Sequence, residues 1–290
     1  MAKPTITIVG TGALGTALLV NLARKGYPIK EIVSRKGRLP LIGNRALPRA
    51  KSLSPKLISP AGARLSAKVI WICVRDSGIR ECAEGFADRI DWRGHIVLHS
   101  SGALTSDELS ALRVRGAAVA SVHPMMTFVS GAQPRLEGIW FAIEGDIEAR
   151  RVAERIVADF GGHSFVIPKS KKPLYHTFGA FLSPLIIAHL ALTERLGAAA
   201  GVPGSRVQSV MRPILEQTLA NYTKLGPAGA LSGPLARGDV ETIRRNLKAL
   251  SKLADAKQIY IDLVRSAMRT LPVKNRRGLQ EMLRGAVTRR

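Results

Sequence analysis

Residues 5–15 read TITIVGTGALG, and this stretch decides the fold. A short run rich in β-branched residues comes directly before Gly10, Gly12 and Gly15, which stand in G-x-G-x-x-G spacing. In this spacing the first glycine forms a tight turn from strand to helix. The second lets backbone N–H groups approach a pyrophosphate, and the third lets the helix pack close to the strand. The stretch therefore predicts the phosphate-binding turn of a βαβ unit.

The residues that follow have the pattern that such a unit requires. Residues 16–25 predict a helix, Gly26 ends it, and residues 29–33 predict a second strand. The amino end of a helix attracts anions. We therefore expect a dinucleotide to bind the loop formed by Gly10, Thr11, Gly12, Ala13, Leu14 and Gly15. The alternative is a glycine-rich turn that binds no ligand.

The end of the second predicted strand indicates which dinucleotide binds. NAD sites place an acidic residue there for the ribose 2′-hydroxyl, whereas NADP sites place arginine nearby. This chain has Ser34, Arg35 and Lys36 at that point, with Arg38 close behind and no acidic residue in reach. Since Ser34 and Arg35 can bind a 2′-phosphate, we expect NADP. In the alternative interpretation these residues only contribute to a basic surface.

Length and composition indicate a globular protein with a sizeable core. The chain has 290 residues, 46% of them hydrophobic, which allows one large or two medium domains. The amino terminus runs directly into the first strand, and we expect neither a signal peptide nor an uncharged apolar stretch of about 18 residues. A soluble, cytoplasmic protein is the expectation. Cys73 and Cys82 lack metal-ligand spacing and are expected to be inert packing residues.

The formal net charge of +23 is unusual and raises the question of a polyanionic partner. The basic residues are spread along the chain, aromatic residues make up only 5%, and no nucleic-acid-binding motif is present. We therefore do not expect nucleic acid as the partner, although it stays a minority alternative. The densest basic cluster is the tail at residues 273–290, which we expect to be a solvated, amphipathic helix. The charge would also attract an anionic cofactor and substrate.

Apolar runs bounded by turn residues predict further strands at residues 69–74, 95–99, 117–122, 139–143 and 164–167. Helices are predicted between them, at residues 77–87, 106–113 and 147–160. Residues 37–60 predict only a short strand or loop. This alternation is typical of an α/β fold with a doubly wound, mostly parallel Rossmann sheet.

After residue 167 the pattern changes to helices alone, predicted at residues 174–196, 206–222, 240–253 and 257–271. We therefore predict an NADP-binding Rossmann-like domain at residues 1–167, an all-helical substrate and dimerisation domain at residues 168–272, and the basic tail. The active site of such a protein is expected in a cleft between the two domains.

The carboxyl ends of the predicted strands carry candidate ligand-binding residues, because open α/β sheets bind ligands there. Val74 and Arg75 end one strand and are expected to border the cofactor. Asp76, the next residue, fits an N-cap of the following helix better than a ligand-binding role.

The next predicted strand ends in His99, Ser100, Ser101 and Gly102. Small hydroxyl residues beside a glycine suit a loop that binds a substrate carboxylate or carbonyl, and we favour this role over a plain turn. His99 fits a proton donor, but a core histidine with satisfied nitrogens fits at least as well.

Two further segments offer catalytic groups. The proline after His123 holds the histidine backbone extended, and its imidazole can donate a proton to a carbonyl oxygen as hydride arrives; a structural turn is the alternative. Lys172, His176, Gly179 and Ser183 are spaced to lie on one helix face. Lys172 would polarise or protonate a carbonyl, His176 would orient the substrate, and Gly179 would leave room for nicotinamide. Alternatively, Lys172 is merely a solvated lysine.

Several sequence blocks in order resemble a bacterial family, provisionally assigned as NADP oxidoreductases, that pairs a Rossmann-like domain with a helical domain of unknown function. The blocks are TITIVGTGALG at 5–15, HSSGAL at 99–104, SVHPMMTF at 121–128, FAIEGD at 141–146, KPLYH at 172–176 and LSGPLARGD at 231–239. The resemblance extends to about residue 271. The layout is similar to that of 6-phosphogluconate dehydrogenase, ketopantoate reductase and pyrroline-carboxylate reductase, which implies a helical domain that helps to form a homodimer.

The resemblance also implies residue roles. The glycine loop, Ser34 and Arg35 would hold NADP, residues 100–102 would form the substrate loop, and Lys172 would be the acid/base. This chain departs from the family at Arg75, where proline is usual, and at Pro184, where asparagine is usual. Pro184 should kink the helix and removes the usual amide.

Arg237 is the last candidate. It stands in GPLARGD at residues 233–239, a predicted loop in which Asp239 would N-cap the helix that begins at Val240. In dimeric relatives of this layout the helical domain approaches the partner's cleft, so we hypothesise that Arg237 binds an anionic substrate by bidentate pairing. The alternative is an arginine on a basic surface.

These observations favour an NADP-dependent oxidoreductase that moves hydride between nicotinamide and a small, anionic carbonyl, hydroxyl or imine compound. The alternatives are a catalytically idle NADP-binding or sensing protein and, less favoured, a basic protein associated with nucleic acid.

Overall fold

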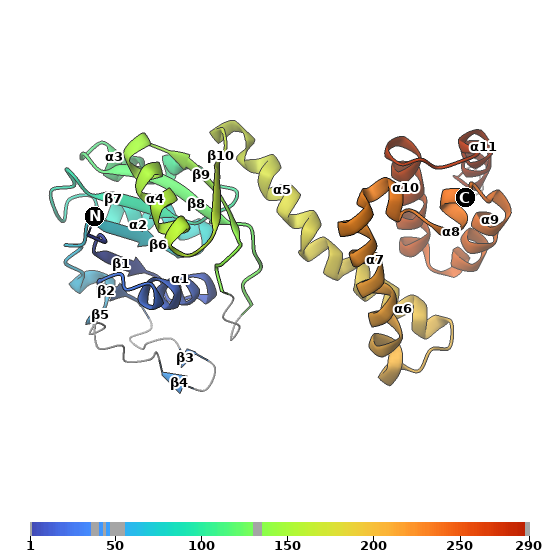
Figure 1. The fold of residues 1–290 in the computed structure, drawn as a ribbon, viewed down its shortest axis with the longest axis horizontal. Helices are drawn as coiled ribbons and strands as arrows, with labels where there is room; N and C mark the ends of the chain where they lie inside the picture. The colour runs from blue at the N-terminus through green and yellow to red at the C-terminus, as the bar shows by residue number, and fades with distance from the viewer. Residues whose placement is uncertain (1, 36–40, 43–44, 47–55, 130–134, 288–290) are drawn as a thin grey trace. The chain divides into compact units, whose positions relative to one another are not determined.

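The computed structural model describes residues 2–35, 41–42, 45–46, 56–129 and 135–287 (Figure 1). The chain divides into two compact units, Met1–Leu185 and Ile186–Arg290. The sequence placed this boundary at residues 167/168, whereas α5 (Lys172–Leu182) groups with the sheet. The side chains of Lys172 and Tyr175 bind residues at the ends of sheet strands, which explains this grouping.

The first unit contains an eight-stranded sheet, mostly parallel, as the sequence predicts. Its strands are β1 (Ile6–Val9), β2 (Ile29–Val33), β5 (Lys56–Ile58), β6 (Val69–Ile72), β7 (Ile96–His99), β8 (Ala118–Pro124), β9 (Trp140–Gly145) and β10 (His163–Val166). They run in the order β10-β9-β8-β7-β6-β1-β2-β5, and only the β8–β9 pair is antiparallel. β3 (Leu41–Ile42) and β4 (Arg45–Ala46) form a separate antiparallel pair.

Helices cover both faces of this sheet (Figure 1). One core contains α1 (Ala13–Arg24) and α4 (Ile147–Asp159), and the other contains α2 (Ile79–Phe86) and α3 (Ser110–Arg113). Successive strand residues alternate between the cores, since side chains along a strand point to opposite faces. The near-continuous apolar strands are therefore buried on both sides, as a doubly wound sheet requires.

The order of the strands reverses direction at β1. The chain moves outward from β1 to β2 and β5, then returns to β6 on the other side of β1 and continues outward to β7 and β8. Ligands of open α/β sheets bind outside the carboxyl ends of the strands at such a switch point. The glycine loop after β1 and the segment after β6 lie at this point.

The second unit is helical. Its helices are α6 (Pro184–Ala199), which begins just before the boundary, α7 (Val207–Ala230), α8 (Gly233–Arg237), α9 (Val240–Ala249), α10 (Ala254–Thr270) and α11 (Arg276–Val287). Its core includes Ile243, Ile261 and Val264 from α9 and α10. Leu279 and Leu283 of α11 are buried in the same core, so the expected basic tail is an amphipathic helix but not a solvated one. Arg289 and Arg290 lie outside the described residues.

Two expected features of the helical region are changed by local backbone chemistry. The predicted helix at residues 174–196 is two helices, because Ser183 has non-helical φ and ψ of −132° and −80° before Pro184. This interruption confirms the break expected at Pro184. The predicted loop around Arg237 is instead the short helix α8, which ends at Gly238 in the left-handed conformation. Asp239 caps α9 as predicted, accepting a hydrogen bond from the N–H of Thr242 at 3.0 Å.

The expectation that the chain lacks a long apolar stretch is wrong. Among the described residues, the helical stretch Lys169–Ala199 has the length and composition of a possible membrane span, with mean hydropathy 1.4. No Asp, Glu, Lys or Arg occurs from residue 173 to residue 193. Length and composition alone do not distinguish a span from a helix that packs against protein, and Ser183 interrupts this one.

Candidate functional site

The glycine loop has the backbone geometry that the motif predicts. Gly10 has a φ of +101°, and a Cβ there would lie 2.5 Å from the carbonyl oxygen of Cys73, just after β6. A Cβ on Gly15 would lie 2.1 Å from the carbonyl oxygen of Gly10. Neither position can accept a side chain without movement of the backbone, so these two glycines bring β1, α1 and β6 together.

Gly12 differs from the other two glycines because its surroundings are open. It has ordinary extended backbone angles, and no atom lies within 4 Å of the position of a Cβ. It is the N-cap of α1, whose first turn contains no acidic residue and whose first N–H groups have no intrahelical partner. A pyrophosphate fits here, because the open position lies beside the first N–H groups of α1, at the positive end of the helix dipole.

The residues expected to select the cofactor lie at the end of β2. Ser34 is buried, and its hydroxyl lies 2.9 Å from the Thr11 hydroxyl, so the two loops are joined by a hydrogen bond. Arg35 is exposed. Lys36 and Arg38 lie outside the described residues. On the other side of the switch point, Val74 is half-buried against Gly10, and Arg75 is exposed.

The structure holds a buried thiol, Cys73, just after β6, and a half-buried one, Cys82, in α2. Burial raises the pKa of both, that of Cys82 to about 12 and that of Cys73 further. Little thiolate is present at neutral pH, which agrees with inert packing residues. Among the described residues, no group of His, Cys, Asp or Glu side chains is arranged to hold a metal ion.

A second polar cluster lies at the carboxyl ends of β7 and β8, and Lys172 of α5 is at its centre. The lysine is only 1% exposed. Its ammonium group donates a 2.7 Å hydrogen bond to the carbonyl oxygen of Ser101 and another to the hydroxyl of Ser121. Burial lowers the pKa of Lys172 to about 8, opposed by the negative charges of Glu144 and Asp76. The side chain is therefore not solvated.

The hydroxyls of the predicted substrate loop are already engaged within the protein. Ser100 accepts a 2.8 Å hydrogen bond from the indole N–H of Trp71. Ser101 donates to the carboxylate of Asp76 at 2.9 Å and accepts from the N–H groups of Ala103 and Leu104. Asp76 does not cap a helix with its side chain, contrary to expectation, because its carboxylate binds this serine.

His99 is a core histidine. It is fully buried, and its ring nitrogens bind the carbonyl oxygen of Thr105 at 3.0 Å and the N–H of Ser101 at 3.1 Å. Burial, with a smaller effect of the Lys172 charge, lowers the pKa of His99 to about 3. A ring that is neutral at pH 7 and has both nitrogens occupied does not serve as a proton donor.

His123 and His176 meet beside Gly102. A Cβ on Gly102 would lie 2.8 Å from Nε2 of His123 and 2.8 Å from Cδ2 of His176, so the missing side chain makes space for both rings. Nδ1 of His123 lies 3.0 Å from the hydroxyl of Tyr175. Burial lowers the pKa of His123 to about 4, with smaller effects from the charges of Lys172 and His176. His176 is exposed.

The remaining predicted residues behave differently. Gly179 does not provide free space, since a Cβ there would lie 3.3 Å from Sδ of Met125. Ser183 lies outside α5, so it does not continue the face of Lys172 and His176. Arg237 is exposed at the end of α8 in the helical unit.

Two residues of the cluster escaped the sequence analysis. Glu144 on β9 is buried, and it accepts hydrogen bonds from the N–H of Ser106 at 2.6 Å and from the Ser106 hydroxyl at 2.9 Å. Tyr175 is 8% exposed and precedes His176. A glutamate in an otherwise apolar strand was the available signal for the first, but no local signal pairs Tyr175 with His123.

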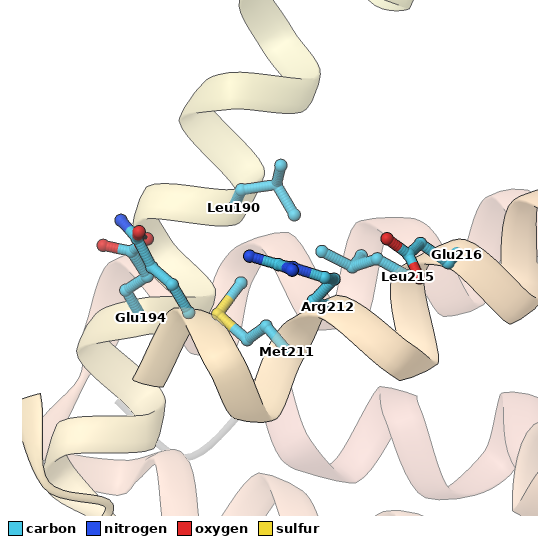
Figure 2. A pocket seen from close by; sticks show the side chains of 7 residues that line it. Leu190, Glu194, Met211, Arg212, Leu215 and Glu216 are labelled. Carbon is cyan, nitrogen blue, oxygen red and sulfur yellow. Dashed lines mark hydrogen bonds between the residues drawn. The ribbon is translucent and has the colours of Figure 1, made fainter. Parts of the chain in front are cut away.

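The helical unit has its own open groove, with a volume of about 350 Å³, between α6 and α7 (Figure 2). It is lined by Leu190, Glu194, Gln208, Met211, Arg212, Leu215 and Glu216. None of the residues predicted for the site is among them.

Comparisons with protein families and solved structures identify the two parts of the chain. Residues 1–124 match the model of a Rossmann-like domain, and residues 139–267 match that of DUF2520, a domain of unknown function. A comparison with curated protein sequences found no significant match. The pairing of these two domains confirms the resemblance drawn from the sequence blocks.

Solved structures share this fold at low identity. The Bacteroides fragilis protein BF3122, provisionally named an NADP oxidoreductase, is 22% identical with a TM-score of 0.71, over 91% of this chain and 97% of that one. Protein TM1727 from Thermotoga maritima is 24% identical with a TM-score of 0.70, over 98% and 100%. A reductive aminase from Aspergillus terreus, in complex with NADPH and ethyl-5-oxohexanoate, is 15% identical with a TM-score of 0.62, over 97% and 99%. At these identities the likeness shows the fold alone.

Buried His99 and half-buried His123 predict an acid-sensitive fold. The unfolded chain binds protons at His99 and His123 near pH 6.5, whereas the folded chain excludes them until about pH 3 and 4. The free energy of unfolding should therefore fall below pH 6.5, by about 1.4 kcal/mol per pH unit for each histidine. Urea unfolding across this range should show a smaller slope for His123→Gln than for the wild-type protein. An undiminished slope in His123→Gln would contradict the assignment.

Proposed function

Since the chain pairs a Rossmann-like domain with a DUF2520 domain, we propose that it is an NADP-dependent oxidoreductase. It would transfer hydride between the nicotinamide and a small, anionic carbonyl, hydroxyl or imine compound. The observation that carries the proposal is the open space at Gly12, at the amino end of α1 and at the switch point of the sheet. The reductive aminase solved with NADPH and the naming of BF3122 support the same cofactor class.

The cofactor would be held by residues on both sides of the switch point. The loop of Gly10, Thr11, Gly12, Ala13, Leu14 and Gly15 would bind the pyrophosphate. Arg35 is exposed and would pair with the 2′-phosphate, while Ser34 would hold Thr11 and thereby the loop. Val74 and Arg75 would border the cofactor from the end of β6.

The substrate would bind beside Gly102, where the absence of a side chain lets two imidazoles approach the backbone. When bound, the cofactor supplies or accepts hydride at the reacting carbon, and the protein must manage the proton at the attached oxygen or nitrogen. His176 is exposed at this point, so we assign it the proton transfer. The backbone of Ser100, Ser101 and Gly102 would line the substrate, since both serine hydroxyls are occupied.

Lys172 has a different role in this proposal from the acid/base role that the family resemblance implies. Its ammonium group is buried and donates a hydrogen bond to the carbonyl oxygen of Ser101. It would therefore hold the backbone of the substrate loop, residues 100–102, in place. Its charge also acts at a distance, because it lowers the pKa of His123.

A homodimer is the proposed assembly, and exposed apolar side chains in the helical unit support it. Of the 24 residues of α7, only Val207 is buried. Large exposed apolar residues of α6 and α7 are Leu185, Ile186, Ile187, Val210, Ile214, Leu215, Leu219, Tyr222 and Leu225. A second copy, burying the same face, would remove this surface from water. Polar residues on the same helices, such as Gln217 and Asn221, favour a protein partner over a lipid one. Light scattering of the intact protein measures the molar mass.

The experiment that tests the function has two steps. NADPH binding is measured first, by energy transfer from protein tryptophan to the reduced nicotinamide. Turnover is then measured by NADPH absorbance against a panel of keto acids and cyclic imines. Binding without turnover of any compound would favour the idle NADP-binding or sensing alternative, and absence of binding would refute the proposal.

Gly12→Val should abolish NADPH binding while leaving the protein folded. The backbone at Gly12 is compatible with any residue, but the isopropyl group would occupy the space proposed for the pyrophosphate. Gly85→Val is the matched control, since its Cβ position is equally open but lies in α2. NADPH affinity is measured by fluorescence titration, and melting temperature reports folding. Retained affinity in Gly12→Val would show that the loop does not bind the phosphates.

Arg35→Ala should weaken NADPH binding by about 10- to 100-fold and NADH binding far less. A charge-assisted hydrogen bond to the 2′-phosphate contributes about 1.5–3 kcal/mol, and NADH lacks that phosphate. Arg24→Ala removes the same charge from an exposed residue at the other end of α1 and should change neither affinity. Equal losses for both cofactors would show that Arg35 does not bind the 2′-phosphate.

Arg237→Ala should raise the KM for an anionic substrate without changing NADPH affinity or melting temperature. The end of α8 is held by the backbone, since the N–H of Lys274 binds the carbonyl of Ala236 at 3.1 Å and Asn275 binds that of Gly238 at 3.2 Å. The exposed guanidinium is therefore presented on a fixed support, which favours bidentate pairing with an anion. Lys248→Ala, also exposed in this unit, is the charge control. An unchanged KM would show that Arg237 does not bind the substrate and is only part of a basic surface.

A further inference from the structure

The two ring nitrogens of His123 have different surroundings. Nδ1 faces the protein and lies 3.0 Å from the hydroxyl of Tyr175. Nε2 faces Gly102, where it lies 2.8 Å from the position that a Cβ would occupy. Among the residues that the structure describes, no hydrogen-bond partner is found for Nε2. One nitrogen is therefore occupied, and the other is directed at the backbone of Gly102, beside which the substrate is proposed to bind.

The direction of the bond between Tyr175 and His123 decides which nitrogen carries the proton. Burial raises the pKa of the Tyr175 phenol to about 12, so the hydroxyl keeps its proton at neutral pH. Within the described chain, the phenol makes this one hydrogen bond, and its 3.0 Å length fits either atom as the donor. Because the phenol keeps its proton and Nδ1 is its one described partner, we take Nδ1 as the acceptor. A neutral imidazole has one donor and one acceptor nitrogen, so an accepting Nδ1 leaves the proton on Nε2.

We propose that Tyr175 is a positioning residue that fixes His123 as the neutral tautomer with its proton on Nε2. His123 then donates a hydrogen bond to the carbonyl oxygen or imine nitrogen of a substrate bound beside Gly102. This inference rests on the proposed oxidoreductase function and assigns a division of labour between the two histidines. His123 polarises the double bond, and exposed His176 transfers the proton to or from the substrate oxygen or nitrogen.

The charged and titratable groups around His123 are consistent with a neutral ring. His176 also borders Gly102, and the buried Lys172 ammonium binds the carbonyl oxygen of Ser101 in the same loop. Both disfavour a second positive charge, and burial disfavours it more strongly. The phenol ring also packs edge-on against the imidazole, with centroids 5.5 Å apart, so the plane of His123 is fixed as well as its tautomer. A ring with this orientation can strengthen its hydrogen bond as charge develops on the substrate.

Tyr175→Phe tests the inference, because it removes the hydroxyl and keeps the aromatic ring that contacts His123 and Phe165. Nitrogen-15 NMR of the imidazoles distinguishes a protonated from an unprotonated nitrogen, and His123→Gln identifies the signals. In the wild-type protein at pH 7, without cofactor or substrate, we expect His123 as the single tautomer protonated at Nε2. In Tyr175→Phe we expect a mixture of both tautomers. A wild-type His123 protonated at Nδ1, or a Tyr175→Phe spectrum without change, would overturn the inference.

Kinetics provide the second measurement. Tyr175→Phe should lower kcat about tenfold and leave NADPH affinity unchanged, and a kcat equal to that of the wild type would refute the role in catalysis. Tyr260→Phe is the matched control, because it removes a phenol hydroxyl that accepts a hydrogen bond from Asn246 in the helical unit. The tautomer is measured in the free protein. A wrong tautomer therefore refutes this inference alone, whereas a failure to bind NADPH refutes the proposed function.

Discussion

The candidate site depends on one buried ammonium group. Lys172 is 1% exposed and donates hydrogen bonds to Ser101 after β7 and to Ser121 in β8, so it ties α5 to the ends of two parallel strands. Burial of a charge is costly unless it is paired and hydrogen-bonded. Here the charges of Glu144 and Asp76 offset part of that cost. The same residues hold the neighbouring segments in place, since Asp76 binds the Ser101 hydroxyl and Glu144 binds Ser106.

The sequence was most informative where a single local pattern imposes the structure. Glycine spacing at residues 10–15 predicted the turn, because positive φ and close backbone contacts exclude side chains at Gly10 and Gly15. Apolar strands alternating with amphipathic helices predicted the doubly wound sheet, since burial on both faces leaves few alternatives. The helix break at Pro184 and the N-cap at Asp239 were also predicted correctly, because each depends on the chemistry of that residue alone.

The sequence was least informative where a role depends on pairing between distant segments. Asp76 fits an N-cap locally, but Ser101, brought beside it by the β6–β7 pairing, takes its carboxylate instead. The sequence around Gly179 does not show that the side chain of Met125, from another segment, fills the space beside this glycine. Tyr175 and His123 are 52 residues apart, and only the seating of α5 on the sheet joins them. The apolar stretch after Lys172 was not predicted, because its two histidines, two threonines and one serine make it look polar although it carries no Asp, Glu, Lys or Arg.

The arrangement of polar groups at Gly102 has a chemical logic that follows from burial. Two imidazoles beside a buried ammonium cannot all be positively charged at low cost, so the more enclosed of these two rings, His123, is the one kept neutral. A neutral ring held by a phenol is a fixed donor, whereas an exposed ring such as His176 can exchange protons with water. Hydride transfer to a carbonyl or imine needs both functions, polarisation of the double bond and delivery of a proton. The difference in burial between two neighbouring histidines is therefore sufficient to separate these functions within one site.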